Sequence, residues 1–272
     1  MTDHTIITVY VVIDDIVKRF GHQDHRLAQV TDAEVLTVAV VAALSFQNHH
    51  ARALEMMIRL GFLSGSLSPS RFNRRLHALS DWLDLVLDVL HDVYRHRAVF
   101  IIDSVPVPVC RRVRAYRCGK VRGIDYCGYC AAKKEKFFGY RLHLVCTIEG
   151  IPVAFTILPA SYHDLTPVHE LTYELSPGAK VIGDTAYNSA KDEASILEDT
   201  GVRLVPQRKV NRWPNRLEDA IDLVECRHQI ETVNSQLEAM GVQRLHARTN
   251  EGIELKVRAS VLALICTNRK AA

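Results

Sequence analysis

Two aspartates each come directly after a short apolar stretch that predicts a buried strand. Asp103 follows Val99 to Ile102, and Asp184 follows Val181 to Gly183. In open α/β sheets, ligands bind beyond the carboxyl ends of the strands, where such side chains would lie. Aspartate is also common where a strand becomes a turn, so either residue alone would favour that ordinary interpretation. The same pattern at two strand ends, with a small residue after each, indicates a shared metal or acid/base site.

A third carboxylate is expected from a helix near the end of the chain. Apolar residues recur at helical spacing between Leu223 and Met240. Arg227 and Glu231 are four residues apart, which makes them neighbours on the surface of that helix. They could form a surface ion pair of about a few tenths of a kcal/mol. In the functional interpretation, Glu231 faces the two aspartates and Arg227 orients it or meets a phosphate.

Asp164 is a rival for the third carboxylate, because it also lies at the end of a predicted strand. It precedes Thr166 and Pro167, which predict the start of a helix. We therefore interpret Asp164 as a turn or helix-start residue.

The first 97 residues have helical patterns throughout. Thr31 and Glu34 predict a capping box, and Ser68 with Pro69 predicts another helix start. The helix that starts there follows a glycine-containing turn and has a basic face, which is the outline of a DNA-binding helix-turn-helix. The alternative is a helical bundle whose arginines are only solvated. The basic residues that we expect to contact DNA here are Arg71, Arg74 and Arg75.

From residue 98 the pattern changes to strands alternating with helices, which is typical of a mixed α/β domain. Residues 138–158 alternate in polarity around Glu149 and Gly150 and predict a hairpin. Pro106 and Pro108 restrict the segment after Asp103 to an edge strand or an extended loop. We predict a helical DNA-binding domain at residues 1–97 and a catalytic domain at residues 98–272, with a mixed sheet flanked by helices.

Two basic segments of the second domain could hold a polyphosphate. The first covers residues 111–136, and the second covers residues 208–216. Lysine and arginine there would give DNA affinity that depends on salt but not on sequence. A tryptophan in the second segment could stack on an unpaired base, although packing is the ordinary role of any single aromatic residue. The residues expected to contact DNA are Arg111, Arg112, Lys133, Lys134, Arg208, Lys209, Arg212, Trp213 and Arg227.

The composition is that of an ordinary soluble globular protein. The 272 residues are 48% hydrophobic and 24% charged, with a net charge of +3, so any nucleic-acid surface must be local. The longest apolar run, residues 35–46, is too short to span a bilayer. The first four residues lack the basic start of a secretory signal. We therefore expect a cytoplasmic protein that does not enter a membrane.

The seven cysteines do not predict a disulfide framework, because the number is odd and the chain is long. Cys127 and Cys130 form a Cys-x-x-Cys motif, with Cys118 upstream, which raises the alternative of a structural zinc site. A second ligand pair at standard spacing is missing from the surrounding sequence. Whether these cysteines bind a metal stays open at this point.

Several of these features together resemble bacterial insertion-sequence DDE transposases, most closely the nine-eighty-two insertion-sequence family. The resemblance runs from about residue 98 to the end of the chain. In a related group of these transposases, a tyrosine stands three residues before the arginine and a lysine seven after the glutamate. Val224 and Glu238 occupy those positions here, so a phosphate-contact role is not carried over to them. The motifs are Asp103, residues 128–135, residues 138–144, Gly183 with Asp184 and the nearby Tyr187, and Arg227-x-x-x-Glu231-Thr232.

The resemblance implies an RNase H-like fold in which Asp103, Asp184 and Glu231 hold two Mg²⁺ or Mn²⁺ ions. It implies a transposase that binds the terminal inverted repeats of its element, cleaves DNA and joins the ends to target DNA. Such an enzyme would act as a homodimer on double-stranded DNA, at the nucleoid of a bacterial cytoplasm. The alternatives are an inactive or domesticated DNA-binding protein and a stand-alone nuclease with the same fold.

Overall fold

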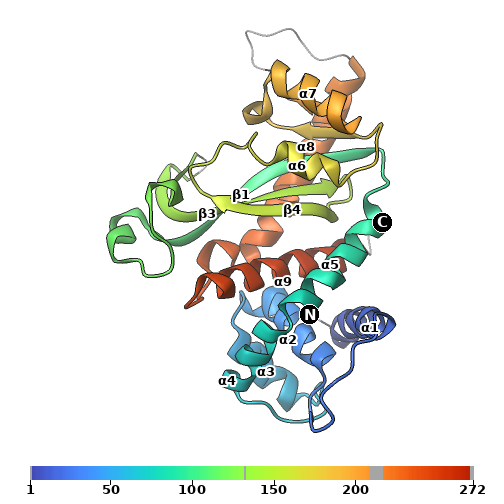
Figure 1. Cartoon of the computed structure of the whole chain (residues 1–272), viewed down its shortest axis with the longest axis vertical. Helices are drawn as coiled ribbons and strands as arrows, with labels where there is room; N and C mark the ends of the chain where they lie inside the picture. The colour runs from blue at the N-terminus through green and yellow to red at the C-terminus, as the bar shows by residue number, and fades with distance from the viewer. Residues whose placement is uncertain (1, 132, 209–216, 270–272) are drawn as a thin grey trace. The chain divides into compact units, whose positions relative to one another are not determined.

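The computed structural model describes residues 2–131, 133–208 and 217–269, without the side chains of residues 217, 218, 220–225 and 227. Figure 1 shows the chain coloured from its N-terminus to its C-terminus. The helices are α1 (Asp3–Arg19), α2 (Asp32–Phe46), α3 (His50–Arg59), α4 (Pro69–Ala78), α5 (Ser80–Tyr94), α6 (Val168–Tyr173), α7 (Ala190–Thr200), α8 (Leu217–Ala239) and α9 (Asn250–Asn268). The strands are β1 (Val99–Arg111), β2 (Cys127–Cys130), β3 (Glu135–Thr147), β4 (Pro152–Pro159), β5 (Lys180–Gly183) and β6 (Arg203–Pro206).

The chain packs into two compact units. A helical unit contains residues 1–90 and 237–270, and a sheet unit contains residues 91–236. The chain passes from one unit to the other within α5 and again within α8. The functional domains predicted at residues 1–97 and 98–272 remain a prediction, because packing alone does not assign DNA binding or catalysis. In none of the described helices is there an apolar stretch long enough to cross a bilayer.

Helix α2 is the centre of the helical unit. Its residues are apolar on all sides and buried from Ala33 to Ala43, as expected for a helix surrounded by others. Helices α1, α3, α4 and α9 all pack against it. Just after α2, the Asn48 amide nitrogen donates to the Met240 carbonyl at 2.8 Å and to the Ser260 hydroxyl at 2.9 Å. These buried bonds fix the C-terminal helix α9 to the N-terminal helices.

Two predicted helix starts in the helical unit are confirmed. Thr31 and Glu34 form the capping box, with the Thr31 amide donating to Glu34 at 2.6 Å. Glu34 also accepts hydrogen bonds from the Ser64 amide at 2.7 Å and the Ser64 hydroxyl at 2.8 Å. Ser68 caps α4 through the Arg71 amide. Residues 60–68 connect α3 to α4, a longer connection than the three or four residues of a typical helix-turn-helix.

The sheet unit has one six-stranded mixed sheet. Its order is β2-β3-β1-β5-β6, with β4 also paired to β3. Strand β3 is antiparallel to β1, β2 and β4, whereas β5 and β6 extend the sheet in parallel from β1. The series β4-β3-β1-β5-β6 is the RNase H-like arrangement that the resemblance implied, and the predicted β3-β4 hairpin is confirmed. Strand β2 is an addition from the basic segment after β1.

Strand β1 continues through Pro106 and Pro108 to Arg111, which confirms the edge-strand alternative for the segment after Asp103. Its pairing with β5 covers only residues 99–101, while its pairing with β3 continues to Arg111. The second half of β1 is therefore an edge on the side away from β3. Prolines are tolerated at such an edge, because their missing amide hydrogens are not needed by a neighbouring strand.

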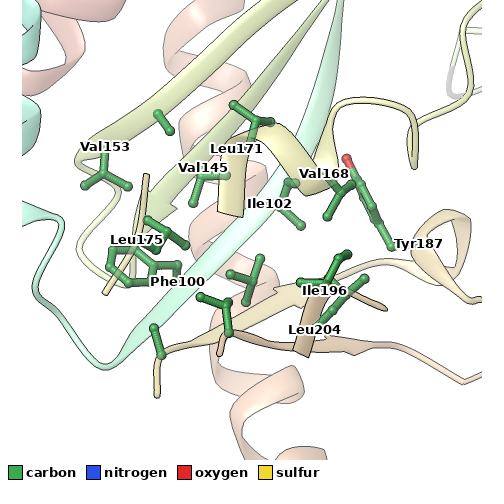
Figure 2. Packing of buried hydrophobic residues seen from close by; sticks show 14 residues of the cluster. Phe100, Ile102, Val145, Val153, Val168, Leu171, Leu175, Tyr187, Ile196 and Leu204 are labelled. Atoms are coloured by element: carbon green, nitrogen blue, oxygen red, sulfur yellow. The ribbon is translucent and has the colours of Figure 1, made fainter. Parts of the chain in front are cut away.

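Helices cover both faces of the sheet. On one face, α6 and α7 contribute Val168, Leu171 and Ile196 to a hydrophobic cluster with Phe100 and Ile102 of β1. Figure 2 shows this cluster, with the Tyr187 ring at its edge and the hydroxyl turned away from Leu204. On the other face, α8 lies over the alternate residues of β1 and β5, as the lining of the cavity described below shows.

The predicted start of α6 at Thr166 is wrong. The helix begins at Val168 with Pro167 at the N-cap position, and no side chain caps it. The Thr166 amide donates to the His163 carbonyl at 2.9 Å, so residues 163–166 form a backbone turn. This turn gives the Thr166 amide an acceptor before the helix begins. Thr166 therefore lies one residue before the N-cap position.

We expect Glu34→Ala to lower the free energy of unfolding by roughly 1–2 kcal/mol, because it removes half of the capping box and the acceptor of the Thr31 and Ser64 amides. Urea denaturation followed by circular dichroism measures this change. Glu55→Ala is the control, since Glu55 forms an exposed pair with Arg59 in α3 and should change stability by less than about 0.5 kcal/mol. Equal effects of the two substitutions would contradict the role assigned to Glu34.

We expect Gly183→Ala to destabilise the sheet unit by roughly 1–3 kcal/mol through overpacking. A methyl group on Gly183 would lie 2.7 Å from the buried Tyr187 ring and 3.1 Å from Ile102. Thermal unfolding measures the effect. Gly119→Ala is a matched control, because nothing lies within 4 Å of the added atom there. A wild-type melting temperature for Gly183→Ala would show that Tyr187 can move freely.

Candidate active site

The pairing of β1 with β5 places Asp103 and Asp184 side by side. The two strands are parallel, and Ile101 is paired with Ile182. Each aspartate lies two residues beyond that pair, and residues two apart in a strand point to the same face. Neighbouring strands are about 4.8 Å apart. Both carboxylates therefore leave the sheet at the same end and on the same face, as the sequence predicted.

Asp184 is also a turn residue, as the ordinary interpretation of this aspartate predicted. It is the N-cap of a short 3-10 turn, Thr185–Tyr187, and its Oδ1 accepts a hydrogen bond from the Ala186 amide at 2.8 Å. Its backbone is still extended, with φ −76° and ψ −172°. The turn and the site role are thus compatible, because the turn orients the carboxylate at the end of the strand.

Helix α8 brings Glu231 to the two aspartates. The Asn234 amide nitrogen donates to Asp103 Oδ2 at 2.7 Å, and Glu231 lies three residues earlier on the same side of the helix. Asp103, Asp184 and Glu231 line one cavity of about 720 Å³, together with His228 and Asn234. The structure therefore brings together the three carboxylates that the sequence singled out.

Sequence reasoning missed His228 and Asn234. Both line the cavity, and they stand three residues before and three residues after Glu231. Residues at this spacing share one side of a helix. The spacing was therefore the signal that could have identified them.

The α8 helix is anchored at its other end to the parallel strands. Arg203 of β6 donates two hydrogen bonds to the Asp219 carboxylate, at 2.8 and 2.9 Å. Lys180 of β5 lies 3.5 Å from the same carboxylate. With Asn234 bonded to Asp103, the helix is held at two separate points along the sheet.

The site concentrates negative charge in a partly buried place. The pKa of Asp103 is raised to about 6, mainly by burial and also by the nearby carboxylates of Asp184 and Asp164. Hydrogen bonds from the Asn234 side chain and the Ser104 amide, the latter at 2.7 Å, oppose this rise. Burial also raises the pKa of Asp184, as does Asp164. A bound cation would offset the cost of these charges.

The donor set fits a hard divalent cation, which prefers carboxylate and amide oxygens. The ligand atoms of Asp103, Asp184 and Glu231 do not all lie within 4.8 Å of one another in the described structure. Among the described residues, that criterion is met by His22, Asp24 and Asp32 of the helical unit. There, Asp32 already bonds to His22 and to Arg75. We therefore consider the carboxylates of the sheet unit to be the better cation site.

Asp164 lies in a turn, as predicted, but its side chain also faces this region. Asp164 Oδ1 is 3.9 Å from Arg141 Nη1 and 3.9 Å from His143 Nδ1. Its charge raises the pKa of both Asp103 and Asp184. The interpretation of Asp164 as only a turn residue was therefore incomplete, because its side chain also faces Arg141 and His143 of β3.

The predicted DNA-contacting residues of α4 differ in their surroundings. Arg71 and Arg74 are exposed. Arg75 is partly buried, with its guanidinium bonded to Asp32 and to the Val30 carbonyl at 2.7 Å. Arg71 and Arg74 are therefore available to a ligand, whereas Arg75 already connects α4 to the start of α2.

The predicted residues of the two basic segments also include one that is bonded within the protein and others that are exposed. Arg208 forms two hydrogen bonds with Glu193, at 2.6 and 2.7 Å. Lys209, Arg212 and Trp213 lie outside the described residues, as does the side chain of Arg227. The exposed members are Arg111, Arg112, Lys133 and Lys134.

The cysteines of the first basic segment are close together without forming a metal-binding cluster. Burial raises the pKa of Cys110, and so does the adjacent thiol of Cys118. Cys118 and Cys127 line a second cavity. No three potential ligands of this segment come within 4.8 Å of one another among the described residues. The zinc alternative thus gains no support from the geometry.

Comparison with known proteins identifies the family. A family model described as a transposase DDE domain matches residues 94–266. A comparison with curated proteins finds no match. A cryo-EM structure of a piggyBac transposase synaptic complex with hairpin DNA is similar with a TM-score of 0.49 and 12% identity, over 98% of this chain and 71% of that one. Because the family model covers more than half of the chain, the protein belongs to the DDE transposases, enzymes that act on DNA and depend on divalent metal ions.

Proposed function

We propose that this transposase binds the terminal inverted repeats of an insertion sequence and uses Asp103, Asp184 and Glu231 to hold two Mg²⁺ or Mn²⁺ ions. One observation carries the proposal: the three carboxylates come from two adjacent strands and one helix and line the same cavity. Carboxylates that share one cavity are suited to hard divalent cations and to the DNA phosphate that accompanies them.

The chain's own residues orient the carboxylates in this proposal. Asn234 holds one oxygen of Asp103 and the Ser104 amide holds the other. These donors favour the charged form of Asp103, which is the form that binds a cation. The Ala186 amide does the same for Asp184. The carboxylates of Asp103, Asp184 and Glu231 would hold the ions, whose chemistry would be to activate an attacking oxygen, from water or a 3′-hydroxyl, and to stabilise the leaving oxygen.

The proposed DNA contacts are of two kinds, one on α4 of the helical unit and one on the two basic segments of the sheet unit. Arg71 and Arg74 would contact the inverted repeat, while Arg111, Arg112, Lys133 and Lys134 would bind phosphates without reading sequence. Arg75 and Arg208 would join these contacts only together with their ion pairs to Asp32 and Glu193. We extend the same role to the residues predicted from sequence alone: Lys209, Arg212, Trp213 and Arg227.

The assembly and setting of the reaction are part of the same proposal. Two transposon ends must be brought together before they are joined to target DNA, so we propose a homodimer on double-stranded DNA. Membership of the nine-eighty-two insertion-sequence family rests on the sequence motifs quoted above. With it we propose action at the nucleoid of a bacterial cytoplasm.

We expect Asp184→Asn and Asp103→Asn each to reduce metal-dependent cleavage of end-containing DNA at least about a thousandfold, because each removes a charged ligand of the ions. A gel assay with labelled DNA and Mg²⁺ measures cleavage, and a gel shift measures binding. Binding should stay within about threefold of wild type.

Glu198→Gln is the control for this experiment, since Glu198 is an exposed carboxylate on α7 and its removal should leave cleavage unchanged. If Asp184→Asn retained cleavage, Asp184 would not be a metal ligand. Wild-type protein that binds the inverted repeat but never cleaves it with Mg²⁺ or Mn²⁺ would support an inactive DNA-binding protein instead.

We expect Arg74→Ala to weaken binding to the inverted repeat by roughly tenfold, because its exposed guanidinium can reach phosphates or base edges. Affinity is measured at several fixed salt concentrations by fluorescence anisotropy. If Arg74 contacts a phosphate, the salt dependence should fall by about one unit of slope.

Arg19→Ala serves as the control for Arg74, because Arg19 is an exposed arginine of α1 paired with Asp15. Arg75→Ala is measured in parallel with thermal unfolding, since loss of its bonds to Asp32 and Val30 should lower stability. Unchanged affinity of Arg74→Ala for the repeat would remove α4 from the proposed DNA contacts.

A further inference from the structure

The cavity of the proposed active site continues onto a third strand, which supplies none of the three carboxylates. Strand β6 is parallel to β5, with Gly183 paired to Pro206, and the backbone amide of Gln207 donates to the Gly183 carbonyl at 2.9 Å. Gln207 therefore stands beside Asp184, each just beyond the end of its own strand. Because neighbouring strands are about 4.8 Å apart, Asp103, Asp184 and Gln207 form a row across β1, β5 and β6.

The Gln207 side chain projects to the same face of the sheet as the two aspartates. Leu204 of β6 belongs to the hydrophobic cluster on the other face (Figure 2). Side chains alternate along a strand, so residue 207, three positions later, faces α8. In agreement, Gln207 lines the same cavity of about 720 Å³ as Asp103, Asp184 and Glu231.

The backbone of Gln207 is fixed, whereas its side chain is available to a ligand. Besides the bond to Gly183, the Gln207 carbonyl accepts a hydrogen bond from the Asn188 side chain at 3.1 Å. These two partners stand on either side of Asp184 in the sequence, so they hold Gln207 in place beside that carboxylate. The side chain is exposed, and its amide forms no hydrogen bond within the part of the chain that the structure describes.

The cavity contains two side-chain amides with different surroundings. Asn234 donates to Asp103 Oδ2 at 2.7 Å and so supports a carboxylate. Gln207 has no such bond to its neighbour Asp184, whose Oδ1 accepts from the Ala186 backbone amide instead. Support of a carboxylate therefore explains Asn234 but not Gln207. The two N–H donors of the Gln207 side chain remain available to a ligand in the cavity.

The chemistry of the lining favours a phosphate as this ligand. Its acidic residues are Asp103, Asp184 and Glu231, and no lysine or arginine lines the cavity among the residues described with their side chains. A DNA strand there needs hydrogen-bond donors, because carboxylates repel its phosphates. An arginine beside Asp184 would compete with a bound cation, whereas a neutral amide donates to a phosphate without doing so. Glutamine is one of the side chains that commonly contact DNA phosphates.

We propose that the Gln207 side chain binds a DNA phosphate next to the one that is cut. This inference rests on the proposed function, because it adds a DNA contact to the same site. The contact lies on the β6 side of Asp184, at the other end of the row from Asp103 and its bond to Asn234. The backbone bonds of Gln207 set its position before DNA binds, so the contact orients the DNA strand relative to the carboxylates.

Affinity for DNA that carries the inverted repeat tests this contact. It is measured by fluorescence anisotropy with Ca²⁺ in place of Mg²⁺, because Ca²⁺ also prefers oxygen ligands. We expect Gln207→Ala to weaken binding by about tenfold, as loss of a hydrogen bond to a charged group does. Gln207→Glu should weaken binding at least as much, because the new carboxylate repels the phosphate. Circular dichroism establishes that each variant is folded, and Glu198→Gln on α7 is the control that should bind like the wild type.

Substituted DNA identifies the phosphate and excludes an indirect effect. A methylphosphonate replaces one charged oxygen of a single phosphate by a methyl group, and it is placed at each phosphate around the cut in turn. At the contacted phosphate it should weaken binding of the wild type by about tenfold and of Gln207→Ala by less than about twofold. Equal effects on both proteins at every position would overturn the inference, as would unchanged affinity of Gln207→Ala for unmodified DNA.

A titration with Mn²⁺ in the absence of DNA distinguishes failure of this inference from failure of the proposed function. Electron paramagnetic resonance of the free ion measures binding. Gln207→Ala should bind Mn²⁺ like the wild type, and weaker binding would overturn the inference, because Gln207 would then be a metal ligand. If Asp103→Asn and Asp184→Asn also bind Mn²⁺ like the wild type, the proposed metal site itself is wrong, whatever the effect of Gln207→Ala on DNA binding.

Discussion

The parallel register of β1 with β5 is the constraint on which the rest of the site depends. Pairing of Ile101 with Ile182 sets the two aspartates at the same level on neighbouring strands. A shift of one residue would turn one carboxylate to the opposite face, because side chains alternate along a strand. The apolar residues of these strands pack on both faces of the sheet. The same burial that stabilises the sheet therefore fixes the geometry of the charges.

Placing carboxylates in such a position has an energetic cost, and the structure reduces it only in part. Hydrogen bonds from Asn234 and the Ser104 amide favour the charged form of Asp103, but burial still raises its pKa to about 6. If arginines compensated these charges fully, a bound cation would add little electrostatic stabilisation. The partial compensation leaves an energetic cost that a bound cation would offset.

The sequence predicted those parts of the structure that depend on local signals. The Thr31 capping box, the β3-β4 hairpin and the strands ending at Asp103 and Asp184 all follow from residue types at short spacing. For the second half of β1 the prolines left an edge strand and an extended loop open, because the outcome depends on pairing with β3, which is distant in sequence. The bonding of Arg75 to Asp32 and the approach of Asp164 to Arg141 join residues far apart in sequence. Neither leaves a local pattern, so both needed the tertiary structure.

The sharing of one core by α2 and α9 has a consequence for the synthesis of the chain. The side-chain hydrogen bonds of Asn48 can form only after Met240 and Ser260 have been synthesised. The N-terminal helices thus leave the ribosome long before the helix that completes their core, whereas the strands of the sheet follow one another closely. Contacts of such high sequence separation form slowly, because a long loop must close first. The helical unit is therefore expected to complete its core only after α9 has been synthesised, later than the strands of the sheet.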